Sequence, residues 1–344
     1  MKKIIFSCVA VATFALGCSK IEITDTNKDA PGAINFTNYI GNVTKATDVT
    51  TPLALAGIGG FKVYGYATDK ALASATTVSL LMNNISVISA DDGVNWTYTP
   101  IQYWPVDSDN KVQFFIYANP ASGALTNWSA LTTSVKPSFD YTSPASSADQ
   151  KDLLYASAYN ENKHGTTDKV DLTFKHALTR INFAARTNKE GVHAKISSIT
   201  LANVYEEGTF TYGAGNSTGS WSGVNTAFTN PITYPIKTTE NVAYHSIDFA
   251  KNFQESNASL MLIPSNNSTI TLQIKFTLYN TANQAITAEI TKNATIDGSS
   301  SAWEIGKNIC YNLILDDSSL TPIIFSVTSN FNWDGETGTG VTYN

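Results

Sequence analysis

The stretch Ile270-Thr271-Leu272-Gln273-Ile274-Lys275-Phe276-Thr277-Leu278 alternates apolar and polar residues without a break. Because successive side chains of a β-strand point to opposite faces of the sheet, this pattern predicts a half-buried strand, apolar towards a core and polar towards water. The same period of two recurs at 61–66, 111–117, 169–174, 309–315 and 323–327. Turn-forming residues separate these runs, and no long stretch has a convincing helical period. The sequence therefore predicts an all-β protein.

The composition supports this fold class and narrows the functions. The chain has 344 residues, of which 42% are hydrophobic and 15% charged, with a net charge of −6 and with 16 Tyr and 16 Phe. Soluble domains average about 25% charged residues, so this chain is poor in charge. Thr, Ser, Asn and aromatic residues are abundant in place of charged residues, and they favour strands and loops. An acidic balance without a long Lys/Arg run argues against a nucleic-acid partner.

The length suggests two domains. A polar connector at 161–168 marks a border near residue 165. We predict two tandem β-sandwich domains, at 46–165 and 166–344. They follow a polar leader at 18–45 that contains one short apolar stretch, Ile34-Asn35-Phe36.

The first residues have the pattern of a secretion signal. Met1-Lys2-Lys3 is a positive start, and the apolar run that follows is too short to span a bilayer. It ends at Ala15-Leu16-Gly17-Cys18, which is similar to a bacterial lipobox, although Ala15 stands where Leu is preferred. We therefore predict a lipoprotein signal peptide at 1–17 and lipidation of Cys18, with palmitate among the acyl chains. An ordinary signal peptide with a chance cysteine is the alternative.

The sequence predicts no catalytic site, no cofactor and no metal site, and so no enzyme. The histidines are scattered at spacings that suit no zinc site. One aromatic cluster suits glycan binding, since aromatic rings can stack on sugars. Its candidate glycan contacts are Trp96, Tyr103 and Trp104. Packing of these rings in a core or on a sheet face is the alternative, and we favour it.

Several segments, taken in order, resemble the fimbrillin family of Bacteroidales, the subunits of type V pili, including its Mfa-like branch. Val43-Thr44-Lys45-Ala46-Thr47-Asp48 is similar to a Thr-Arg-Ala-Thr element before the first domain. The most specific piece is Val170-Asp171-Leu172-Thr173-Phe174-Lys175-His176-Ala177-Leu178-Thr179-Arg180-Ile181. The other segments are 61–68, 103–105, 114–118, 259–264 and 323–333.

This resemblance implies two β-sandwich domains of the fimbrillin type, exported as an outer-membrane lipoprotein and assembled into a cell-surface fimbrium. It implies proteolytic cleavage between Lys45 and Ala46, which removes a strand that includes Ile34 and Phe36. A donor strand at 321–333 of a neighbouring subunit then fills the groove by strand addition. The expected partners are other fimbrial subunits, the outer membrane and a receptor on a host or bacterial surface. The implied donor anchors are Ile323, Phe325, Val327, Phe331 and Trp333.

Two departures from the family pattern keep alternatives open. The family usually has Arg where Lys45 stands, and a Gly/Thr-rich tail at 334–344 continues past the donor strand. Either departure also suits an accessory, anchor or tip subunit, or a chain that does not polymerise. The alternative function is a monomeric surface lipoprotein that binds host or dietary glycan.

Overall fold

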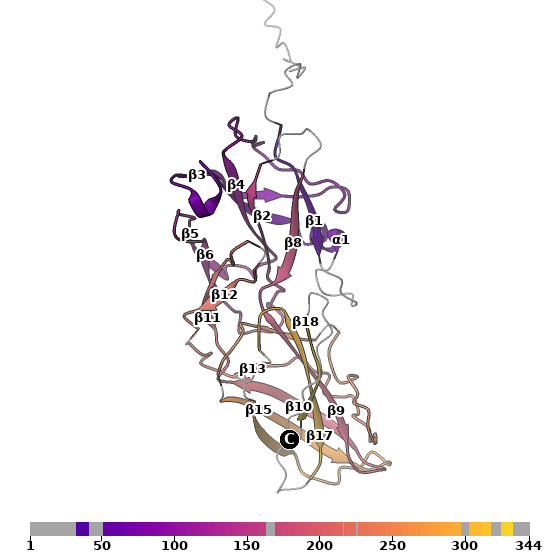
Figure 1. Cartoon of the computed structure of the whole chain (residues 1–344). Helices are drawn as coiled ribbons and strands as arrows, with labels where there is room; N and C mark the ends of the chain where they lie inside the picture. Colours follow the sequence, from indigo (N-terminus) through magenta and orange to yellow (C-terminus); the bar gives the residue numbers. More distant parts are fainter. Residues whose placement is uncertain are drawn as a thin grey trace, which may run out of the picture. The chain divides into compact units, whose positions relative to one another are not determined.

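A computed structural model describes residues 32–40, 51–162, 169–215, 217–224, 226–256, 258–267, 269–296, 303–317 and 325–332. Strands dominate these residues, which confirms the predicted all-β class (Figure 1). The short helix α1 (Pro52–Gly57) has Thr51 as its N-cap, whose side chain accepts a hydrogen bond from the Ala54 N–H. A single 3₁₀ turn, η1, spans Leu72–Ser74. Among the described residues, no helix is long and apolar enough to cross a bilayer.

The first sandwich is built on a six-stranded sheet with the order β1-β8-β7-β4-β2-β3. Its neighbours pair antiparallel except β1, which runs parallel to β8. The strands are β1 (Phe36–Ile40), β2 (Phe61–Thr68), β3 (Val78–Val87), β4 (Lys111–Ala118), β7 (Leu154–Glu161) and β8 (Val170–His176).

Both faces of this sheet are buried. On β4, Phe114 belongs to one core cluster together with Leu55 of α1 and Trp104. Its neighbour Phe115 belongs to a second cluster on the opposite face, together with Phe139. A strand that is covered on both faces needs apolar residues at nearly every position, and β4 has them.

The second cluster lies against a four-stranded sheet with the order β12-β11-β6-β5. Two of its strands come from much later in the chain than the other two, and Glu207 pairs with Thr142. The strands are β5 (Leu125–Ser129), β6 (Ser138–Thr142), β11 (Glu207–Thr211) and β12 (Ser220–Ser222).

The second sandwich has two four-stranded sheets, with the orders β13-β10-β15-β16 and β14-β9-β17-β18. One hydrophobic cluster fills the space between them, including Phe183, Ile274 and Tyr311. The stretch that predicted the fold is β15, whose odd and even residues differ in burial as the alternation requires. The strands are β9 (Thr179–Thr187), β10 (His193–Ala202), β13 (Ile232–Thr233), β14 (Leu260–Leu262), β15 (Ile270–Tyr279), β16 (Ile290–Ile296), β17 (Lys307–Leu315) and β18 (Phe325–Asn332).

The border predicted near residue 165 falls between β7 and β8, which are hydrogen-bonded neighbours in one sheet. Leu154 pairs with His176 across this point. The chain passes to the second sandwich only after β8, at Ala177 and Leu178, and it returns with β11 and β12. The strands of the two sandwiches are therefore interleaved in sequence. β11 and β12 follow β9 and β10 of the second sandwich in the chain, yet β11 pairs with β6 of the first.

Candidate functional site

The segment that contains Ile34 and Phe36 is held by backbone hydrogen bonds on two sides. On one side, the Ile34 N–H donates to the Gln102 carbonyl over 2.9 Å and the Trp104 N–H donates to the Gly32 carbonyl over 3.2 Å. On the other side, the Val170 N–H donates to the Asn35 carbonyl over 2.7 Å, and β1 continues beside β8 (Figure 1). The segment thus fills a slot between β8 and residues 102–104.

The side chains of this segment are part of the first core. Ile34 is 0% and Phe36 2% exposed. The Phe36 ring lies 5.4 Å from the Phe114 ring and 6.0 Å from the Phe61 ring, both edge to face. The Tyr98 hydroxyl donates to the Ile34 carbonyl over 2.7 Å, and burial raises the pKa of Tyr98. Removal of the segment would open an apolar groove along β8 and leave these polar groups without partners.

The predicted donor strand coincides with β18, the outermost strand of its sheet. It pairs antiparallel with β17 of its own chain, where Phe325 lies opposite Leu313, Val327 opposite Tyr311 and Phe331 opposite Asn308. Ile323 and Trp333, the remaining predicted anchors, lie outside the described residues.

The predicted processing sites also lie outside the described residues. These are Cys18 for lipidation and the bond between Lys45 and Ala46 for cleavage. The described chain ends its first segment at Ile40 and resumes at Thr51.

The candidate glycan platform does not form a shared surface. Trp96 is 7% and Trp104 1% exposed, and both belong to the core cluster that contains Phe36. Tyr103 alone is exposed, at 57%. Stacking on a sugar needs an open ring face, so the burial of both indoles fits the packing interpretation.

Acidic and histidine side chains meet at one buried place in the first sandwich. His176 Nδ1 lies 2.8 Å from Asp152 Oδ1, and both side chains are buried. The pKa of the nearby Tyr141 is raised, mainly by burial and to a smaller extent by the electrostatic interaction with Asp152. Such a pair, closed to solvent, is a structural element of the core. Within the described ranges, no group of three or more His, Cys, Asp or Glu residues is arranged to hold a metal ion.

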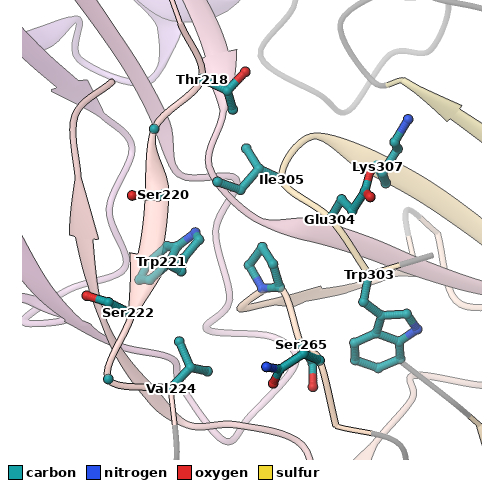
Figure 2. A pocket seen from close by; sticks show the side chains of 14 residues that line it. Thr218, Ser220, Trp221, Ser222, Val224, Ser265, Trp303, Glu304, Ile305 and Lys307 are labelled. Carbon is teal, nitrogen blue, oxygen red and sulfur yellow. The ribbon is translucent and has the colours of Figure 1, made fainter. Parts of the chain in front are cut away.

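One feature that the sequence did not indicate is a cleft of about 780 Å³ beside β12. Trp221 stands on one wall, and Ile305, Glu304 and Lys307 stand on the other (Figure 2). Ser265 and Trp303 close its lower end in this view. Its lining comes from three separate parts of the sequence, at 218–224, 264–266 and 303–307, so no local pattern could have predicted it.

Three comparisons place the chain among known proteins. The model of the fimbrillin-like family matches residues 44–330. A fimbrium subunit of Phocaeicola vulgatus, Fim1C, is 29% identical over 201 residues, which are 52% of this chain and 50% of that protein. The chain therefore aligns with about half the length of this curated relative.

Two solved structures align with most of the chain at low sequence identity. A candidate cell adhesion protein of Bacteroides uniformis has a TM-score of 0.49 and 12% identity, covering 88% of this chain and 98% of its own. A fimbrial assembly protein of Parabacteroides distasonis has a TM-score of 0.45 and 12% identity, covering 90% and 99%. The assignment does not depend on these structures, because the family model alone spans most of the sequence. The resemblance predicted from the sequence is thereby confirmed, and the chain belongs to the fimbrillin-like family.

Proposed function

We propose that this chain is a structural and adhesive subunit of a cell-surface fimbria, anchored in the outer membrane through Cys18 before assembly. Assembly proceeds by strand exchange after a protease cuts behind Lys45. The observation that carries this proposal is the burial of Ile34 and Phe36 in a slot between β8 and residues 102–104. The name of the similar fimbrium subunit from P. vulgatus supports it.

The outgoing strand can leave without dismantling the sandwich. β1 is the outermost strand of its sheet, so its departure breaks the ladder with β8, the hydrogen bonds to residues 102–104 and the core packing of Ile34 and Phe36, but no other strand pairing of the sheet. The vacated groove would expose the apolar pockets of two large side chains. At about 1.5–3 kcal/mol each, refilling them contributes roughly 3–6 kcal/mol before ordering costs.

The incoming strand is also an edge strand. β18 has one neighbour, β17, in its sheet order, and donation breaks that single ladder. Apolar and polar residues alternate in its sequence, where Ser326 stands between Phe325 and Val327. A groove that accepts side chains at every second position, as Ile34 and Phe36 now occupy it, suits such a segment.

The test compares two leader variants. The full chain is digested briefly with a Lys-specific protease and inspected by negative-stain microscopy, and mass spectrometry identifies the new N-terminus. We expect fibres from the natural chain and from Lys28→Ala, and none from Lys45→Ala, because cleavage at Lys28 leaves β1 attached.

A third variant separates donation from cleavage. Phe325→Asp would place a charge on the donor strand, so we expect normal cleavage at Lys45 and no fibres. Monomers from the natural chain after complete cleavage at Lys45, with β18 still protected from hydrogen exchange, would contradict strand exchange.

A further inference from the structure

The cleft beside β12 lies at the open edge of a sheet. β12 ends the order β12-β11-β6-β5 and pairs with β11 along one side, with Trp221 opposite Phe210. Its other side borders the cleft, which is lined by residues 218–224. An edge strand beside a groove is the arrangement that accepts an additional extended segment, through backbone hydrogen bonds and pockets for alternate side chains.

Trp221 gives this cleft a fixed apolar wall. Its indole Nε1 donates to the Ala177 carbonyl over 2.8 Å. Its ring packs edge to face against Phe210 at 5.3 Å. Gly208 permits this close packing, because a Cβ there would lie 3.0 Å from Trp221 Cε3. The half-buried ring is therefore held from behind and contributes its remaining surface to the cleft (Figure 2).

The opposite wall leads directly to the end of β18. Glu304, Ile305 and Lys307 stand on that wall, and β17 begins at Lys307. In the antiparallel ladder, Lys307 pairs with Asn332, the last residue of β18. The chain therefore leaves β18 at the rim of the cleft. Trp333 is the next residue in the sequence, and residues 333–344 lie outside the described residues.

We propose that the cleft binds the chain's own C-terminal segment, Trp333–Asn344, as an extended strand along the open edge of β12. Extended residues advance about 3.3 Å each, so a few residues past Asn332 are enough to cross a cleft of this size. The indole of Trp333 would pack against Trp221 and Ile305. Asp334 and Glu336, the acidic residues of the tail, would lie near Lys307.

This inference rests on the proposed function and adds a regulatory step to it. A tail held in the cleft keeps β18 on β17 of its own chain. The donor strand is then withheld until the open groove of a neighbouring subunit competes for it. The tail past the donor strand, a departure from the family pattern, acquires a role as a latch.

The first test uses a synthetic peptide of residues 333–344 with a fluorescent label. We compare the full chain with a variant that ends at Asn332, and measure binding by fluorescence anisotropy. We expect the shortened chain to bind the peptide and the full chain to bind it at least about tenfold more weakly, because its cleft is occupied. Trp221→Ala in the shortened chain should weaken binding by about tenfold or more, as is typical for a buried Trp anchor. Tyr244→Ala, at an exposed aromatic residue that does not line the cleft, should leave binding unchanged.

The second test leaves the chain at full length, so that a folding defect of the shortened form cannot mislead. Hydrogen exchange of residues 220–222 should be slow in the natural chain and should accelerate in Trp333→Ala, while exchange in β15 stays the same. Equal exchange in both chains, or equal peptide binding by the full and shortened chains, overturns the proposal. Trp221-dependent binding of the full chain on a glycan array also overturns it, because the cleft would then be open.

Both tests use the unassembled protein. Failure of the latch therefore leaves the fibre experiment with Lys45→Ala unaffected. A chain that forms no fibres after cleavage can still show a tail-filled cleft.

Discussion

The strands β4 and β15 are both central antiparallel strands, yet they bury their residues differently. Every residue of β4 after Lys111 is buried. In β15, burial alternates from Ile270 to Tyr279. The difference follows from the layers around each strand, because core clusters cover both faces of the β4 sheet, whereas a single cluster covers one face of the β15 sheet. A strand's burial pattern thus reports how many of its faces are covered.

The largest expected effect concerns the tyrosines that cover the second face of the β4 sheet. Burial raises the pKa of Tyr64 and of Tyr159 to about 12, and it also raises the pKa of Tyr66 and Tyr117. In the unfolded chain these phenols ionise near pH 10. Their protonated form is favoured in the folded state, so this stability is complete below pH 10 and is lost as the pH rises to about 12.

In the second sandwich, burial raises the pKa of Tyr234. Because several tyrosines with a raised pKa lie together in the first sandwich, we expect it to unfold at a lower alkaline pH than the second. Hydrogen exchange in β4 and β15, followed together with phenolate absorbance, measures this order. If the tyrosines ionise near pH 10 while β4 is still protected from hydrogen exchange, this expectation is contradicted.

Substitution of either of two adjacent residues in β4, Phe114 or Phe115, should strongly lower the free energy of unfolding. Phe114 packs against Phe36 and Trp104 on one face, with ring centroids at 5.4 and 6.1 Å. Phe115 packs against Tyr212 on the other face at 5.2 Å. Each change to Ala should lower the free energy of unfolding by about 3–5 kcal/mol, as is typical for buried Phe. Urea denaturation measures it, and a cost under about 1 kcal/mol for either residue would show that its face is not covered.

A smaller effect is expected for the buried amide of β4. Gln113 is 0% exposed, and its Nε2 donates to Thr68 Oγ1 and Asn160 Oδ1, each over 3.1 Å. Gln113→Ala should cost about 1–3 kcal/mol in the free energy of unfolding, because partners are left unsatisfied. Gln273 of β15 is the matched control, since its side chain bonds Asn293 at an exposed position. Equal losses from Gln113→Ala and Gln273→Ala would remove the distinction between the two strands.

The smallest effect is expected on the polar face of β15. Lys275 alternates with buried Ile274 and Phe276. Lys275→Ala should change the free energy of unfolding by less than about 0.5 kcal/mol, as for most surface positions. Phe276→Ala serves as the positive control in the same urea titration. A large loss from Lys275→Ala would mean that a second layer covers this face.

Local alternation was enough to predict β15, β8 and the core face of β17 with Ile309, Tyr311 and Leu313. It also marked Ile34 and Phe36, because apolar residues in a polar leader stand out. It could not predict that β11 returns to pair with β6, since strand partners are chosen by long-range fit. For the same reason, a local pattern could predict neither that β7 and β8 pair across residue 165 nor the cleft at Trp221, whereas the burial of Trp96 agrees with the packing interpretation that we favoured.

The interleaved order of the strands also determines when the chain can fold during synthesis. The first sandwich needs β12, so it cannot close its second sheet until Ser222 has been made. The second needs β17, whose residues from Asn308 onward run parallel to β9 from Arg180 onward. Pairings of such high sequence separation are slow to form. A ribosome that has reached residue 165 has therefore produced a sheet that still lacks β8, and the nascent protein stays open until nearly its whole length is available.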